Sequence, residues 1–111
     1  MIIKYANKKI EKVCLDLDYA KRKYPEKIAK ELHKAKNFII SSETLLDVMN
    51  YKPYNFHDLK GDRKGQYAID IGGRKGGYRL ICSFQEEKEI VFAESIKITE
   101  IILKEMGNHY E

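Results

Sequence analysis

The sequence predicts an α+β fold with two layers, in which an N-terminal strand and helices pack on a C-terminal antiparallel β-sheet. Apolar residues recur with a period near 3.6 through the first half of the chain, which is typical of helices that bury one face. From residue 67 the period changes to two, as in a strand with one buried face. The 111 residues match the size of one domain, so we treat residues 1–111 as a single unit.

Composition and the length of the apolar runs limit the class of protein. Hydrophobic residues make up 43% of the chain and aromatic residues 11%, so a wholly disordered chain is not expected. No apolar run approaches the roughly 20 residues of a membrane-spanning helix, and residues 1–5 lack the apolar stretch of a secretory signal. We therefore expect a cytoplasmic protein with no membrane partner. Cys14 and Cys82 form no paired motif, which predicts two buried, reduced thiols rather than a zinc or redox site.

The first half of the chain contains signals for one strand and three helices. Residues 2–5 form a short apolar segment, and Asn7 can cap a helix over residues 8–15. Pro25 suits the first position of a second helix. That helix carries an apolar stripe at helical spacing, formed by Ile28, Leu32, Ala35 and Ile39. A short third helix is predicted from Ser41 or Ser42 through Met49.

The second half contains signals for an antiparallel sheet. Tyr67, Ile69 and Ile71 alternate with other residues, and residues 78–84 alternate in the same way after a glycine-rich turn at residues 72–77. These two segments predict a hairpin. Residues 90–92 and 96–103 are predicted to add strands, the second with a bulge near residues 100–101.

Positive charge is concentrated in the first two thirds of the chain, although the formal net charge is only +4. Residues 56–79 hold six basic and three acidic side chains, whereas residues 80–111 hold three and seven. Six glycines and two tyrosines are interleaved with the six cations, which are Lys60, Arg63, Lys64, Arg74, Lys75 and Arg79. Such a segment can bring cations and backbone close to phosphate. A solvated hairpin with no binding role accounts for the same composition.

One stretch of the chain resembles a known toxin family. Residues 57–71 read His-Asp-Leu-Lys-Gly-Asp-Arg-Lys-Gly-Gln-Tyr-Ala-Ile-Asp-Ile, and residues 78–81 read Tyr-Arg-Leu-Ile. This is similar to the motif of the HigB, or plasmid-maintenance killer, branch of the RelE/ParE toxin superfamily. In that branch the segment leads into a strand, and a short turn leads to an aromatic-Arg pair on the next strand. The order of strand, helices and sheet agrees as well, so the resemblance implies a RelE-like fold.

The resemblance also implies an activity. It implies the toxin of a type II toxin–antitoxin system, a ribosome-dependent mRNA endoribonuclease that inhibits translation and uses no metal and no cofactor. The implied partners are the ribosome, mRNA and a cognate antitoxin, an acidic or HigA-like helix-turn-helix protein. In the family reaction the RNA 2′-hydroxyl attacks the adjacent phosphate, so the site needs a proton acceptor, a proton donor and cations.

His57 and Arg79 match the histidine and the strand arginine of the family motif. Imidazole exchanges protons near neutral pH, and a guanidinium can hold a phosphate in a fork of N–H donors. Each residue also has a purely structural interpretation. His57 could bond to a nearby backbone carbonyl, and Arg79 could form an ion pair with Asp70 across the sheet.

The remaining cations occupy less specific positions. Arg74 lies in a turn where family members often carry a second basic residue, but the turn is longer and richer in glycine here, so Lys75 could take that place. The other candidate RNA-binding residues are Lys60, Arg63 and Lys64, which could contact the phosphate backbone. Alternatively, Arg63 pairs with Asp62 and only shapes its turn.

The C-terminus departs from the family pattern. Family members typically end in an acidic-Tyr-His string near the active site, whereas this chain ends in Asn-His-Tyr-Glu. His109 and Tyr110 could still supply a second proton-transfer group or a stacking surface for a base. The alternative is a frayed tail with no fixed role.

Two other functions remain open at the level of sequence. One is a ParE-like toxin that binds DNA gyrase and performs no chemistry, and the other is a non-toxic RNA-binding module. Fold alone does not separate these functions. The combination of His57 with Lys60, Arg74 and Arg79 favours RNA cleavage, because a gyrase-binding protein needs none of that chemistry.

Overall fold

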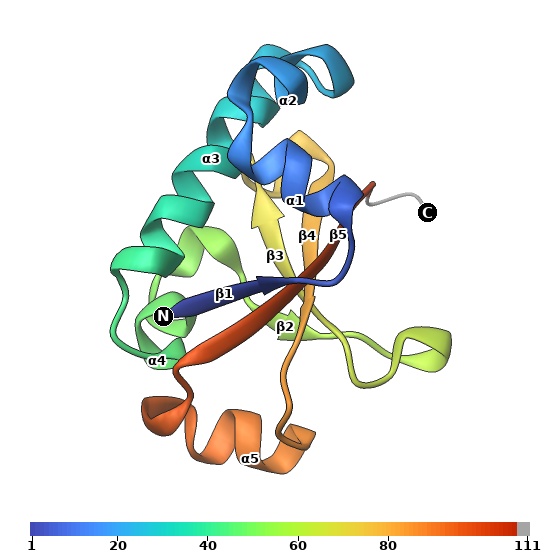
Figure 1. The fold of residues 1–111 in the computed structure, drawn as a ribbon. Helices are drawn as coiled ribbons and strands as arrows, with labels where there is room; N and C mark the ends of the chain where they lie inside the picture. Colours follow the sequence, from blue (N-terminus) through green and yellow to red (C-terminus); the bar gives the residue numbers. More distant parts are fainter. Residues whose placement is uncertain (109–111) are drawn as a thin grey trace.

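The computed structural model describes residues 1–108 and confirms the α+β class (Figure 1). Its helices are α1 (Lys8–Leu15), α2 (Leu17–Lys23), α3 (Glu26–Ser41), α4 (Leu45–Asn50) and α5 (Lys88–Ala93). Its strands are β1 (Ile2–Tyr5), β2 (His57–Asp58), β3 (Tyr67–Ile71), β4 (Tyr78–Ser83) and β5 (Glu100–Asn108). Four short 3-10 turns, η1 (Lys52–Tyr54), η2 (Gly61–Arg63), η3 (Arg74–Gly76) and η4 (Ser95–Lys97), connect them. Within residues 1–108 no helix is long and apolar enough to cross a bilayer.

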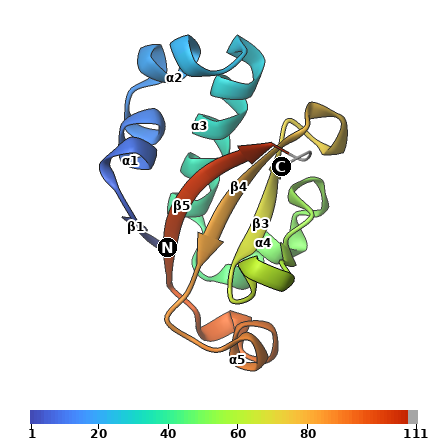
Figure 2. The same ribbon diagram turned by 90° about the vertical axis from the view of Figure 1, so that its right-hand side faces the viewer.

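The five strands form one mixed sheet in the order β1-β5-β4-β3-β2. The strands β2 to β5 pair antiparallel as predicted, but β1 pairs parallel with β5 and places Ile3 beside Ile101. The prediction that the N-terminal strand packs on the sheet together with the helices is therefore wrong. Parallel neighbours need a long connection, and here the helices and the hairpin supply it. Figure 2 shows α1, α2 and α3 together on one side of the sheet.

The helical layer forms where local signals are strong. The side chain of Asn7 caps α1 by accepting a hydrogen bond from the Ile10 amide at 3.0 Å. The predicted stripe of α3 is buried along its whole length. Pro25 is the N-cap of this helix and not its first residue. The helix α2 was not predicted, because it has no apolar stripe: Ala20 is its buried residue, and Asp16 both ends α1 and caps α2.

The two faces of the sheet have different environments. Tyr67, Ile69 and Leu80 belong to the core shared with the helices. Side chains alternate along a strand, so Asp70 and Arg79 lie on the opposite face, away from α1 to α3. This face is therefore the one that presents polar side chains of the predicted motif.

Two predicted details of the C-terminal part are wrong. Residues 90–92 form part of α5, in which Val91 is buried while Ile90 and Phe92 are exposed. The strand predicted for residues 96–103 begins at Glu100 and ends at Asn108. Its bulge is not near residues 100–101, because the register shifts where Ile81 pairs with Glu105 and Cys82 pairs with Leu103.

The two cysteines are free and buried, as predicted. Burial raises the pKa of the Cys14 thiol to about 12, and the nearby Lys36 ammonium only partly opposes this shift. Burial also raises the pKa of Cys82. Both thiols are therefore protonated and inert at neutral pH, because the thiolate is the reactive form.

Candidate functional site

A cavity of about 290 Å³ lies on the sheet face opposite α1 to α3. We call it the histidine cavity; its lining residues are Asn55, His57, Asp70, Arg74 and Arg79. Three of the residues predicted to be catalytic, His57, Arg74 and Arg79, thus meet here from β2, η3 and β4. An imidazole and two guanidinium groups around one cavity can exchange a proton and bind an anion.

Strand pairing and the packing of the preceding residue hold the backbone around His57 in place. His57 lies on β2 and pairs with Ala68 of β3, while the preceding Phe56 stacks on Tyr67 with ring centroids 5.4 Å apart. The Nδ1 atom of His57 lies 2.6 Å from the carbonyl oxygen of Asn55. The structure therefore contains the bond to a nearby backbone carbonyl that the structural interpretation of His57 predicted. It occupies one ring nitrogen and leaves the second, Nε2, for other chemistry.

Asp70 and Arg79 lie directly opposite each other on β3 and β4. Asp70 is only 1% exposed, and its Oδ2 accepts a hydrogen bond of 3.2 Å from the side-chain amide of Asn55. The cross-strand position that the structural interpretation of Arg79 requires is therefore present. The Nε atom of Arg79 is buried and has no hydrogen-bond partner within residues 1–108. A buried donor without a partner is costly.

The turn between β3 and β4 brings Arg74 to the cavity. Gly72 has a φ of 78°, and a Cβ there would lie 2.7 Å from Cδ1 of Ile28 on α3. The turn therefore packs closely on the helical layer, which fixes the start of η3. Arg74 is exposed and lines the cavity, whereas Lys75 is exposed and is not one of the lining residues. Of the two cations proposed for this place, Arg74 is the one that the turn presents to His57.

A second hollow, of about 730 Å³, lies on the other side of β2. We call it the lysine pocket; its lining includes Lys60, Lys64, Leu59, Tyr67, Asp58 and Lys88. Consecutive residues of a strand point to opposite faces, so His57 and Asp58 belong to different hollows. The predicted RNA-binding residues Lys60 and Lys64 thus lie beside the histidine cavity and not within it.

A partly exposed ion pair borders the lysine pocket. Asp58 Oδ2 lies 2.9 Å from Lys88 Nζ. The hydrogen bond from Lys88 is the largest cause that lowers the pKa of Asp58, and the same bond raises the pKa of Lys88. Both groups are therefore charged at neutral pH, so the rim of the pocket is not uniformly positive.

Arg63 serves a structural role in the folded chain. Its guanidinium forms an ion pair of 2.7 Å with Glu105 of β5 and a hydrogen bond of 3.2 Å to Gln66 Oε1. The alternative that it pairs with Asp62 is therefore wrong. Since β4 separates β3 from β5, Arg63 reaches across β4 and ties the loop between β2 and β3 to the sheet.

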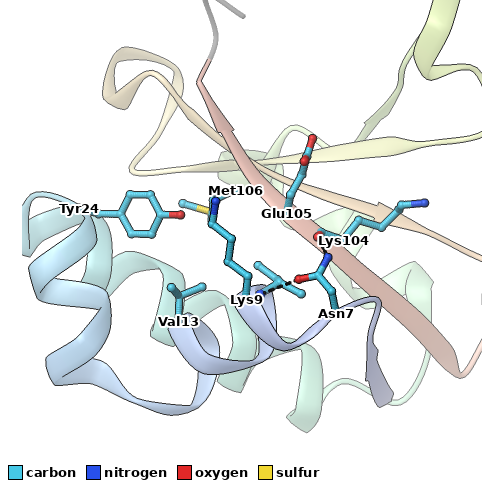
Figure 3. Close-up of a pocket in the computed structure, with 8 residues that line it drawn as sticks. Asn7, Lys9, Val13, Tyr24, Lys104, Glu105 and Met106 are labelled. Atoms are coloured by element: carbon cyan, nitrogen blue, oxygen red, sulfur yellow. Dashed lines mark hydrogen bonds between the residues drawn. The ribbon is translucent and has the colours of Figure 1, made fainter.

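A third hollow, of about 120 Å³, lies between α1, Tyr24 and β5 (Figure 3). Burial is the first cause that raises the pKa of Tyr24, so its phenol stays protonated at neutral pH. The carboxylate at this site, Glu105, is already paired with Arg63. This hollow has no imidazole among its lining residues, and we regard the histidine cavity as the candidate site.

The motif did not identify one residue of the cavity, Asn55. It has φ 44° and ψ 48°, and it is the only residue other than glycine with a positive φ in the part of the chain that the structure describes. Its signal in the sequence is weak, since asparagine merely tolerates this left-handed conformation better than most residues. The predicted residues His109 and Tyr110 lie outside the described residues. Asn108 is the last described residue and pairs with Tyr78 across β4 and β5, directly beside the pair that contains Arg79.

A scan against protein-family models finds no match for this chain, and a search of curated proteins finds none either. Within residues 1–108 no group of three or more His, Cys, Asp or Glu side chains could hold a metal ion. The sequence motif and the histidine cavity are therefore the features that bear on function.

Proposed function

We propose that this protein is the toxin of a type II toxin–antitoxin system, an mRNA endoribonuclease that cleaves translated mRNA on the ribosome. The proposal includes a RelE-like arrangement of the fold and membership of the HigB branch. The observation that supports it best is the meeting of His57, Arg74 and Arg79 in one cavity. Each of the three residues comes from a different segment, and the motif or its turn predicts each of them.

In the proposed reaction the RNA 2′-oxygen attacks the adjacent phosphorus. The 2′-O–P bond forms, the P–O5′ bond breaks, and the proton of the 2′-hydroxyl passes to a base, for which His57 is the proposed group. Negative charge grows on the phosphate oxygens in the transition state. Arg79 and Arg74 are proposed to stabilise it through charge-assisted hydrogen bonds, and their place beside His57 in the lining of the cavity supports this assignment.

The departing 5′-oxygen needs a proton. His109 and Tyr110 remain the predicted candidates for that donor, on the basis of the family resemblance. The proposed binding of the flanking RNA uses Lys60 and Lys64 of the lysine pocket, which are exposed and can contact phosphates without reading sequence. Lys75 is proposed for the same task beside Arg74.

The proposed partner that silences the toxin is a cognate antitoxin, of an acidic or helix-turn-helix kind. An acidic partner would complement the cations of residues 56–79, and like charges in the RNA would compete for the same surface. This part of the proposal is supported by the charge distribution and the family resemblance.

The test is to incubate the purified protein with a defined mRNA, alone and on programmed ribosomes, and to map new 5′ ends by primer extension. We expect cuts that require the ribosome and that disappear in His57→Ala and Arg79→Ala. The matched controls are His33→Ala and Arg22→Ala. His33 also bonds a backbone carbonyl, with Nε2 2.8 Å from Val13 O, and Arg22 is an exposed arginine on α2, so neither touches the cavity.

Two results would contradict the proposal. Growth arrest by an intact protein that cleaves no mRNA, with inhibited gyrase, would favour the ParE-like function. Neither cleavage nor arrest, with retained RNA binding, would favour a non-toxic RNA-binding module.

A further inference from the structure

The chain makes an unusual turn immediately before β2. Asn55 adopts the left-handed conformation, and its backbone N–H donates to the carbonyl oxygen of Lys52 at 2.9 Å, which closes η1. This conformation is strained for most residues, and asparagine tolerates it better because its short polar side chain can bond locally. The turn directs both the carbonyl and the side chain of Asn55 toward the histidine cavity.

The backbone carbonyl and the side-chain amide of Asn55 each have a partner there. Its backbone carbonyl oxygen lies 2.6 Å from Nδ1 of His57, and its side-chain Nδ2 donates to Oδ2 of Asp70 at 3.2 Å. A carbonyl oxygen can only accept a hydrogen bond. The Nδ1 atom must therefore carry a hydrogen, and in the neutral imidazole the lone pair is on Nε2.

We propose that Asn55 is a positioning residue that fixes the tautomer and the ring orientation of His57. Its carbonyl holds the Nδ1–H, and its side chain is anchored on a carboxylate that is buried on the rigid strand β3. The result is that His57 presents Nε2 to the cavity as a proton acceptor. An orienting partner of this kind commonly sets which nitrogen of a histidine reacts.

The competing explanation is that Asn55 only allows the chain to turn between η1 and β2. On that view the contact with Asp70 contributes to stability, and the stacking of Phe56 on Tyr67 is enough to fix the ring of His57. The two explanations predict different tautomers of His57 in a variant that keeps the turn but lacks the hydrogen bond between Asn55 and Asp70.

The first variant is Asn55→Asp. Aspartate also tolerates the left-handed conformation, but it places a second carboxylate against Asp70, so the anchoring bond is lost. The matched rescue is Asn55→Asp with Asp70→Asn, which restores a bond between the two side chains with its direction reversed and leaves the net charge of the protein unchanged. Asn55→Gly is the third variant, because it permits the turn without any side chain.

The measurement is the ring ¹⁵N spectrum of histidine-labelled protein, with the His57 signals assigned from the His57→Gln variant. We expect wild-type His57 to be in the Nδ1–H tautomer above its titration range. We expect Asn55→Asp and Asn55→Gly to give a mixture of tautomers, and the double variant to regain the Nδ1–H form. Circular dichroism and thermal unfolding establish that each variant is folded.

The inference about catalysis rests on the proposed function, and a second readout tests that step. In single-turnover cleavage on ribosomes we expect Asn55→Asp to lower the rate constant by about 10- to 100-fold, with little change in ribosome affinity and with recovery in the double variant. A wild-type protein that cleaves nothing would refute the proposed function, while the tautomer spectra would still decide the role of Asn55. A folded Asn55→Asp variant that keeps the Nδ1–H tautomer would refute the positioning role.

Discussion

The histidine cavity and the lysine pocket lie on the two sides of β2 and differ in how their charges are held. In the cavity, Asp70 is buried, His57 is tied to a backbone carbonyl, and Arg79 keeps a buried Nε without a partner among residues 1–108. In the pocket, Lys60 and Lys64 are exposed, and the Asp58–Lys88 ion pair is partly exposed.

Under the proposed function, this difference corresponds to two separate tasks. Groups that are buried and fixed keep their interactions strong, because little water screens them. Exposed cations interact with any nearby phosphate and are weakened by salt. A chain that needs chemistry at one phosphate and attachment along its neighbours would separate the two tasks in this way, and the separation can be tested.

The largest expected effect is that of Arg79. We expect Arg79→Ala to lower the single-turnover rate of mRNA cleavage by about 10²- to 10³-fold, since it removes the donor that we propose to stabilise charge in the transition state. Arg79→Lys should recover only part of the rate, because an ammonium lacks the planar fork. The loss should persist at saturating protein and change little with salt. Full recovery by lysine would place Arg79 with the exposed cations of the lysine pocket.

The next effect is that of the pocket lysines. Each phosphate contact to a single strand adds about 0.7 to the slope of log K against log salt concentration. We therefore expect the double variant Lys60→Ala, Lys64→Ala to reduce that slope by about 1.4 in titrations of single-stranded RNA. The saturated cleavage rate should stay the same. Lys97→Ala is the matched control, because Lys97 is exposed on η4 and pairs with Glu94; an equal effect there would show that the pocket has no special role.

The elements that the sequence predicted correctly are those with local signals. For α1 the cap and the first buried residues lie within one turn of each other, and for α3 one apolar stripe runs the length of the helix. The partner of β1 is a nonlocal choice that no window of sequence contains. The run Ile90-Val91-Phe92 has strand-like residue types, yet it forms α5, since packing overrides β propensity in so short a segment.

The site shows the same limit. The motif identified His57 and Arg79, and the structure brings them together with Arg74. The motif alone could not show that Lys60 belongs to a different hollow, because that depends on which face of the sheet each residue of β2 points to. Nor could it identify Asn55, whose contact with His57 is made by a backbone carbonyl that every residue possesses.

The third prediction concerns the loop between β2 and β3, which borders the lysine pocket. Glu105→Gln removes the ion pair with Arg63, whose two side chains are about half exposed. We expect the free energy of unfolding to fall by no more than about 1 kcal/mol, the usual limit for exposed pairs. Limited trypsin digestion should become faster at residues 63 and 64, because the loop loses its tie to β5. Glu94→Gln breaks the exposed pair with Lys97 and is the control; equal digestion of both variants would contradict the role of Arg63 as a tie.

The smallest effect is expected at the rim of the lysine pocket, where Asp58 and Lys88 form a partly exposed ion pair. The folded-state pKa of Asp58 lies below its ordinary value of 3.8, mainly through the hydrogen bond from Lys88. The stability that this carboxylate contributes is therefore present above pH 3.8 and is lost as the pH falls through the folded pKa. Lys88 behaves in the opposite sense, since its folded pKa is raised from 10.5 and its contribution is lost as the pH rises through the folded value.

We therefore expect Asp58→Asn to be slightly less stable than the wild type at neutral pH and to approach it in acid. Chemical denaturation at a series of pH values measures the difference, which should also shrink in high salt because the pair is partly exposed. Lys88→Met should abolish the effect of Asp58→Asn in a double-mutant cycle. A difference that persists in acid and in salt would mean that Asp58 is held as firmly as Asp70, and the contrast between the two sides of β2 would then rest on Arg79 alone.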